Sequence, residues 1–84
     1  MSISTDLYRT FLGVGLHLSF SKAAKEIGVS QSAISQSIKQ LEKELNMVLF
    51  ERTTKSVSFT PEGKELFDTV AKAFSILDNG VTQL

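Results

Sequence analysis

The 84-residue sequence has no cysteine and no tryptophan, and it has only one proline and one histidine. Without cysteine, disulfides and thiolate metal sites are excluded. No apolar run approaches the roughly 20 residues that span a bilayer, and the N-terminus lacks the basic start and apolar segment of a secretion signal. We therefore expect a cytoplasmic protein without membrane contact. We expect one domain with a single core, and its length is near the lower limit for domains that fold alone.

The net charge is zero, because nine Lys and Arg residues balance nine Asp and Glu residues. A nucleic-acid-binding domain is usually basic on one face, so this balance counts against such a role. The charges are unevenly distributed, since residues 21–60 carry six basic and four acidic side chains, and residues 61–84 carry two and four. Any attraction to phosphate would therefore involve residues 21–60, and it would be modest.

Residues 20–38 form the most informative segment, because they predict two short helices joined by a tight turn. Gly28 suits the turn, since glycine adopts left-handed geometry without a Cβ penalty. We expect Ser21 to cap a helix over residues 22–27. This layout is typical of a helix-turn-helix, whose second helix enters the DNA major groove.

The second helix of this pair is expected over residues 31–45, with Ser30 as its cap and Asn46 at its end. Its apolar positions form one face: Ile34, Ile38, Leu41 and Leu45. An earlier helix should begin at Ser4 or Thr5 and bury a stripe made of Leu7, Phe11, Val14 and Leu18. Gly13 and Gly15 disfavour that helix, so either another helix approaches closely there or the helix is weak.

Residues 48–59 predict a short β-hairpin, in which Val57 and Phe59 alternate with serines as in a half-buried strand. Thr60, Pro61 and Glu62 then form a strong helix start, and this last helix can run towards Leu84. The expected fold is therefore mainly α. Residues 1–60 would form a winged helix-turn-helix, a three-helix core plus a hairpin wing, and residues 61–84 a linker and dimerisation helix.

The last helix carries a heptad seam of six apolar residues: Phe67, Val70, Phe74, Leu77, Val81 and Leu84. Leu66 and Phe67 can cover the core, whereas Phe74 and the residues after it would be left in water. Burial against a second copy would remove this stripe from solvent, so we expect a homodimer. The alternative is that the stripe packs back on its own domain or on another segment.

Five blocks of this sequence, in this order, resemble the N-terminal domain of LysR-type transcriptional regulators. The blocks are residues 19–24, 29–35, 41–45, 49–52 and 60–63. The resemblance implies a bacterial regulator that binds an imperfect palindrome in double-stranded DNA and dimerises through its last helix, with tetramers among full-length members. A small-molecule effector would bind only to a further C-terminal domain, which this chain lacks, so we expect a fragment of a longer regulator.

Two departures from the family fall on the second helix of the pair. Ser32 stands where the family commonly has Pro, and Gln36 where it commonly has Arg. Gln36 loses a charge but can pair bidentately with adenine. Leu16 and Leu18 also depart from the family, which is usually polar or Gly there, and they would enlarge an apolar patch.

The candidate DNA-binding residues come from three segments. They are Ser21 and Lys22 at one helix start, Ser30, Gln31, Ser32, Ser35, Gln36 and Lys39 on the next helix, and Arg52, Thr53 and Lys55 in the wing. We expect Gln31, Ser35 and Gln36 to contact bases and Lys39 to contact phosphate. Ser21 and Lys22 would bind phosphate at a helix N-terminus, although a plain cap explains Ser21 equally. Arg52 and Lys55 flank the wing turn and would reach backbone phosphate or the minor groove, although Arg52 could instead pair with a local acid.

The main alternative to DNA binding is a protein-interaction module, because winged helices also serve as docking domains and the chain is neutral. An enzyme is not expected, since no nucleophile, base and orienting group can be assembled. His17 stands without a second histidine or a cysteine, so we expect an exposed loop residue and no metal site. We expect no cofactor.

Overall fold

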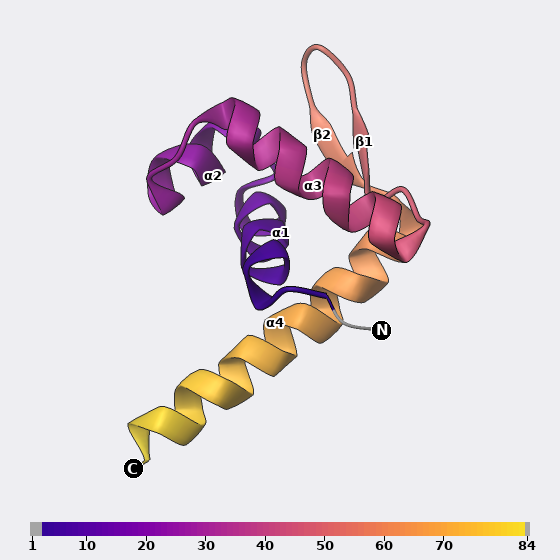
Figure 1. Ribbon diagram of the computed structural model, residues 1–84. Coiled ribbons are helices and arrows are strands. Elements are labelled where there is room, and N and C mark those ends of the chain that lie inside the picture. Colours follow the sequence, from indigo (N-terminus) through magenta and orange to yellow (C-terminus); the bar gives the residue numbers. More distant parts are fainter. Residues whose placement is uncertain (1–2, 84) are drawn as a thin grey trace.

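The computed structural model describes residues 3–83, which form four helices and one two-stranded antiparallel hairpin. The elements are α1 (Thr5–His17), α2 (Phe20–Ile27), α3 (Gln31–Leu45), β1 (Phe50–Arg52), β2 (Val57–Phe59) and α4 (Pro61–Thr82). Figure 1 shows the hairpin projecting from the helical body beside α3, and the C-terminal part of α4 extending away from it. This is the winged helix-turn-helix with a long last helix that the sequence predicts.

Side-chain caps define most helix starts where the sequence places them. Ser4, Ser30 and Thr60 accept hydrogen bonds from the backbone N–H groups of Asp6, Ala33 and Gly63 at 3.2, 3.1 and 3.0 Å. Gly28 and Asn46 end α2 and α3 with positive φ angles of 86° and 55°. The predicted boundaries of α3 are therefore confirmed.

The predicted start of α2 is wrong, because Ser19 and not Ser21 is its cap. The Ser19 hydroxyl accepts from the Lys22 N–H at 3.1 Å, and Ser21 lies inside the first turn. The physical reason is Phe20, which is buried on the same helix face as Ala23 and Ala24. That face is continuous only if the helix already includes residue 20.

The predicted burial of Leu18 is also wrong, since α1 ends at His17 and Leu18 takes a left-handed conformation with 41% of its surface exposed. The helix must stop there so that the chain can turn into α2. The two glycines of α1 do mark close approaches. A Cβ on Gly13 would lie 3.2 Å from Ile27 Cδ1, and one on Gly15 would overlap the Phe67 ring.

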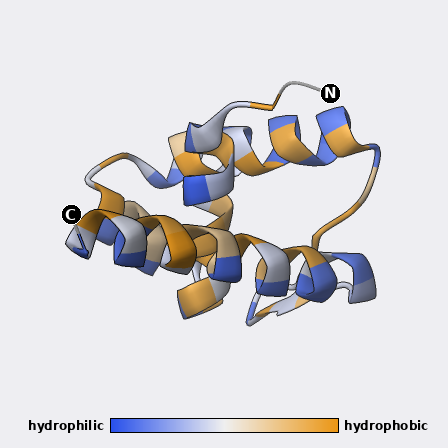
Figure 2. Ribbon diagram, turned by 90° about the horizontal axis from the view of Figure 1, so that it is seen from below, coloured by the Kyte–Doolittle hydropathy of each residue, from blue (hydrophilic) through white to orange (hydrophobic). Residues whose placement is uncertain are grey.

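The core lies between α1, α2, α3 and the base of the hairpin, with α4 covering one side. Its largest fully buried side chains are Phe11, Val14, Ile34, Ile38, Leu41 and Leu49. Phe50 links the hairpin to the helices, because its ring lies 5.4 Å from Phe11 and 5.3 Å from Phe59. Figure 2 shows hydrophobic and hydrophilic residues mixed along the helices, as expected for helices with one buried face.

The seam of α4 is divided between its own domain and solvent. Val70 and Phe74 are buried, and the Arg9 guanidinium lies 4.7 Å from the Phe74 ring centroid. The expectation that Phe74 stands in water is therefore wrong, because α4 still packs against α1 at Phe74. Leu77 and Val81 are 60% and 71% exposed. Leu84 lies outside the described residues.

Candidate nucleic-acid interface

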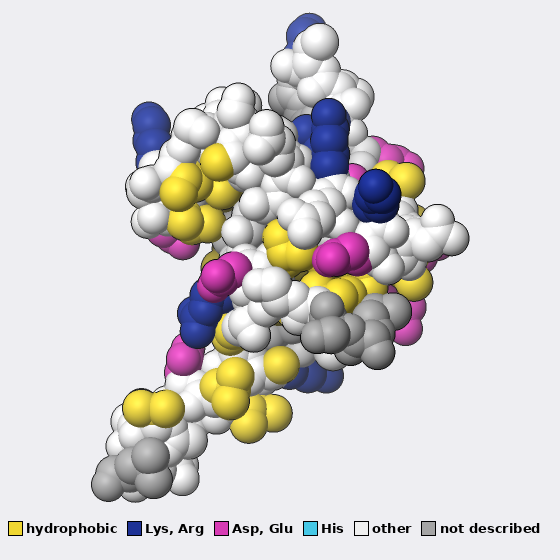
Figure 3. Space-filling view, viewed as in Figure 1, with side chains coloured by type: hydrophobic (Ala, Val, Ile, Leu, Met, Phe, Trp, Pro, Cys, Tyr) yellow, Lys and Arg dark blue, Asp and Glu magenta, His cyan; other side chains and the backbone are white. Residues whose placement is uncertain are grey.

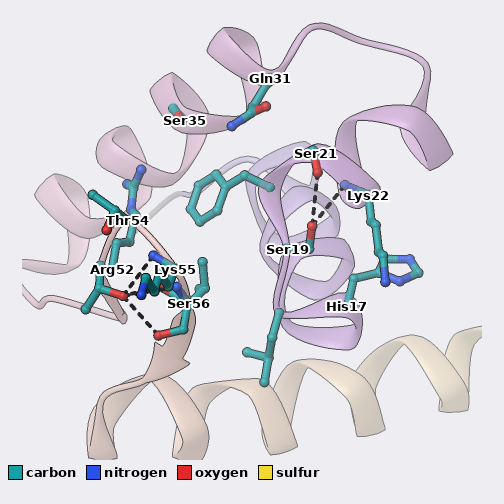
Figure 4. Close-up of a pocket in the computed structure, with 14 residues that line it drawn as sticks. His17, Ser19, Ser21, Lys22, Gln31, Ser35, Arg52, Thr54, Lys55 and Ser56 are labelled. Atoms are coloured by element: carbon teal, nitrogen blue, oxygen red, sulfur yellow. Dashed lines mark hydrogen bonds between the residues drawn. The ribbon is translucent and has the colours of Figure 1, made fainter.

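A groove of about 500 Å³ lies between the start of α2, the first turns of α3 and the hairpin (Figure 4). It brings together seven of the predicted residues: Ser21, Lys22, Gln31, Ser35, Arg52, Thr53 and Lys55. The other four are exposed outside the groove: Ser30 at the cap of α3, and Ser32, Gln36 and Lys39 along that helix. The three predicted segments thus meet on one side of the molecule.

The groove is positively charged although the chain is neutral. Lys22, Arg52 and Lys55 are among its lining residues, and no aspartate or glutamate is. Glu26, the acid next to this region, is held by His17 at 2.8 Å between Nε2 and Oε2. His17 is therefore exposed as expected but ends α1, and it is not in a loop. Low-dielectric walls around like charges concentrate their field, which favours a bound anion.

The outer face of α3 makes no hydrogen bond or ion pair with the rest of the described chain. Gln31, Ser32, Gln36 and Lys39 are exposed, Ser35 is half-buried, and none of their side chains forms a hydrogen bond or ion pair within residues 3–83. The opposite face holds the helix to the core. The outer side chains can therefore hydrogen-bond to an external surface without breaking an existing contact.

The start of α2 contributes backbone donors to the groove. Its first-turn N–H groups have no partner inside the helix, as at any helix N-terminus. The Ser19 cap takes the Lys22 N–H and lies 3.3 Å from the Ser21 hydroxyl. With Lys22 adjacent, this end of the helix suits an anion such as phosphate.

The hairpin turn is held by Thr53. Its hydroxyl oxygen accepts from the backbone N–H groups of Lys55 and Ser56 at 3.2 and 3.0 Å, so the Thr53 oxygen is already engaged. Arg52 makes no ion pair with an acid within residues 3–83, which removes the alternative of a local acidic partner. Its guanidinium instead lies 4.2 Å from the ring centroid of Phe20.

A buried link holds the hairpin against α3. The Glu42 carboxylate accepts from the backbone N–H groups of Leu49 and Phe50 at 2.7 and 3.4 Å. Because Glu42 is on α3 and Phe50 begins β1, this link couples the wing to the helix whose outer face is free. The sequence indicated no such role for Glu42.

Sequence reasoning missed Ser19 and Phe20 as parts of the groove. The signal was present, because Phe20, Ala23, Ala24 and Ile27 have the spacing of one helix face. Recognising that face would have moved the helix start to residue 20 and the cap to Ser19. Within the described residues no cluster of three acidic or histidine side chains could hold a metal ion, and none of their helices is long and apolar enough to cross a bilayer.

Fold and surface together define a winged helix-turn-helix of the nucleic-acid-binding type. Residues 5–64 match the family described as bacterial regulatory helix-turn-helix protein, lysR family. The chain therefore belongs to the lysR family, as its sequence blocks predict.

Two relatives illustrate the match. The chain is 45% identical over 74 residues to the uncharacterized HTH-type transcriptional regulator YcaN of Escherichia coli strain K12, covering 88% of this chain and 24% of the relative. It is 41% identical over 77 residues to the HTH-type transcriptional activator AmpR of Citrobacter koseri, covering 92% and 27%. The chain thus spans about a quarter of the length of these relatives. They are transcriptional regulators, which confirms the expectation that the chain is not an enzyme.

A solved structure agrees with the fold. The chain in the crystal structure of the BenM_DBD/catB site 1 DNA complex superposes with a TM-score of 0.90 at 33% identity, covering 96% of this chain and 91% of that one.

Proposed function

We propose that this chain is the DNA-binding domain of a bacterial transcription regulator in the cytoplasm, and that it binds double-stranded DNA as a homodimer. The observation that carries the proposal is the acid-free groove beside the outer face of α3, whose polar side chains make no internal hydrogen bond or ion pair. In a DNA duplex, the backbone phosphates would bind in the groove, and the base edges would contact the outer face of α3. The DNA-bound BenM domain has this fold, which supports the same assignment.

In the proposed complex α3 enters the major groove. Gln31, Ser35 and Gln36 would contact base edges, with Ser30 and Ser32 beside them, and Lys39 would contact the backbone. The phosphate strand would lie in the groove, against Ser21 and Lys22 on one side and Arg52, Thr53 and Lys55 on the other. Thr53 is the weakest candidate, because its oxygen already accepts two hydrogen bonds in the turn.

Self-association is proposed through α4. An apolar groove of about 230 Å³ runs between α1 and α4, and its lining includes Tyr8, Leu66, Phe74 and Leu77. Leu77 is exposed, and so are Ile76 and Val81, which do not line the groove. Figure 3 shows hydrophobic side chains along the projecting part of α4, well separated from the cationic hairpin tip. A second copy's α4 would cover the groove and these exposed side chains, with Phe67, Val70 and Phe74 supporting the surface from below.

Two copies related by a two-fold axis would present two α3 helices to an imperfect palindrome. The effector, and any tetramer, would belong to the remainder of a longer regulator, and relatives about four times as long support this. On this proposal residues 1–60 read DNA and residues 61–84 join the copies.

DNA binding is tested by anisotropy titration of a labelled mixed-sequence duplex between about 50 and 200 mM salt. Salt-sensitive binding supports the proposal, and its absence would favour a protein-docking module. Lys39→Ala should lower the log–log salt slope by about 1, whereas Lys72→Ala on α4 should leave it unchanged. Equal slopes for the two variants would remove Lys39 from the phosphate contacts.

Base recognition is tested by selecting preferred sites from random duplexes. Gln36→Ala should relax the preference at one base pair per half-site and weaken the best site by about 1–3 kcal/mol. Gln40→Ala, one turn further along α3, should retain the preference. An unchanged site profile for Gln36→Ala would refute the assignment.

Dimerisation is tested by sedimentation velocity. Leu77→Asp should shift the protein to monomers, because it places a charge on the proposed interface. Leu16→Asp is the matched control, since Leu16 on α1 is 62% exposed and lies outside that groove. A dimer that survives Leu77→Asp would exclude the interface.

A further inference from the structure

The contact between Arg52 and Phe20 has no role in the assignments above. The Arg52 guanidinium carbon lies 4.2 Å from the centroid of the Phe20 ring, within the distance of about 6 Å at which a cation is attracted to an aromatic face. The two residues are 32 positions apart in the sequence and belong to opposite walls of the groove. Phe20 begins α2, and Arg52 ends β1.

The Phe20 ring is held in place by the residues packed around it. It is buried, with 6% of its surface exposed, and its centroid lies 6.1 Å from that of Phe50 in an edge-to-face arrangement. Phe50 is in turn packed against Phe11 and Phe59. The orientation of the Phe20 ring is therefore set by the core of the protein.

The Arg52 guanidinium lies over the Phe20 ring, and its N–H groups make no hydrogen bond within residues 3–83. Its side chain forms no hydrogen bond or ion pair within residues 3–83, and Figure 4 shows it reaching across the groove towards α3. A contact between the cation and the ring uses no N–H group, so the guanidinium can still bind a phosphate in a bidentate manner. Lys22 and Lys55 stack on no aromatic ring in the described part of the chain.

We propose that Phe20 is a positioning residue for DNA binding, which holds the Arg52 guanidinium in the groove in the orientation that binds one backbone phosphate. This inference rests on the proposed function. A long side chain normally loses rotamer freedom when it binds, and a side chain already ordered in the free protein avoids most of that loss. Phe20 would thus raise affinity without touching DNA.

The test is a double-mutant cycle in DNA affinity. Phe20→Leu removes the aromatic face and keeps an apolar side chain, and Arg52→Met removes the charge and keeps the length. With Arg52 present, Phe20→Leu should weaken binding about 3- to 10-fold. In the Arg52→Met background the same change should weaken it less than about 2-fold, because no cation remains to be positioned.

Phe11→Leu is the matched control for loss of core packing. Phe11 is fully buried in the same ring cluster, and no Arg or Lys of the described chain stacks on it. It should lower the free energy of unfolding while leaving DNA affinity unchanged at temperatures where all variants are folded. Equal affinity losses for Phe20→Leu in both Arg52 backgrounds would overturn the proposal, because Phe20 would then act only through the fold.

A measurement on the unmodified protein covers the case in which Phe20→Leu does not fold. The ring current of Phe20 should shift the Arg52 side-chain proton resonances upfield in the DNA-free protein, and unshifted resonances would overturn the proposal. If the unmodified protein binds duplex but Arg52→Met retains full affinity and salt slope, this inference fails and DNA binding stands. If the unmodified protein shows no salt-sensitive binding, the proposed function itself fails.

Discussion

Replacing Gly63 by alanine should destabilise the protein, although helix propensity alone predicts the opposite. Gly63 is buried in the first turn of α4, where it lies against the chain that enters β1. In an exposed helix the same replacement would stabilise by about 1 kcal/mol. Here the new Cβ would overlap the Leu49 carbonyl oxygen and lie 2.8 Å from its carbonyl carbon. These are backbone atoms and cannot rotate away.

The magnitude follows from what must move. Overpacking of a core site costs about 1–3 kcal/mol. The same Leu49 oxygen accepts the Thr60 N–H at 3.0 Å, and a displaced carbonyl left unpaired costs about 1–3 kcal/mol more. Subtracting the propensity gain leaves a loss of about 1–5 kcal/mol in the free energy of unfolding.

Gly80→Ala is the matched control, because it makes the same chemical change in the same helix where a Cβ would meet nothing within 4 Å. It should stabilise by up to about 1 kcal/mol. Urea denaturation at one fixed protein concentration measures both, since the proposed dimerisation would make stability depend on concentration. A Gly63→Ala protein at least as stable as the parent would refute the packing argument.

Two further predictions concern stability. Ser19→Ala should destabilise by about 1 kcal/mol because it removes the cap of α2, whereas Ser21→Ala should stay within about 0.5 kcal/mol; the reverse order in urea denaturation would restore Ser21 as the cap. Glu42→Gln should destabilise by about 1–2 kcal/mol through the weakened link to Leu49 and Phe50, whereas the exposed Glu44→Gln should have little effect. Equal urea denaturation midpoints for Glu42→Gln and Glu44→Gln would show that the hydrogen bonds from Leu49 and Phe50 to Glu42 contribute nothing to stability.

Local signals predicted the fold well where one residue has one physical role. Ser30, Thr60, Gly28 and Asn46 each stand at a helix end, and the structure gives each the predicted geometry. The start of α2 was missed because Ser19 and Ser21 have the same chemistry two residues apart. Only the burial of Phe20 decides between them, and burial depends on the whole core.

Tertiary contacts account for the remaining differences. An apolar stripe on a long helix has the same spacing whether it faces a second copy or the helix beneath it, so Phe74 could not be assigned from periodicity. The three segments of the groove were identified one by one from their residue types. The three segments line one groove, and Arg52 lies over Phe20, because residues far apart in the sequence pack together.

Only the buried face of α3 is needed to hold the helix in the fold. Ile34, Ile38 and Leu41 are buried and hold the helix to the core, whereas no side chain from Gln31, Ser32, Gln36 or Lys39 bonds to the rest of the described chain. Substitutions on the outward face should therefore be nearly neutral for folding. If α3 reads DNA as proposed, relatives with this scaffold could diverge in operator preference through single amino-acid changes, without compensating mutations in the interior.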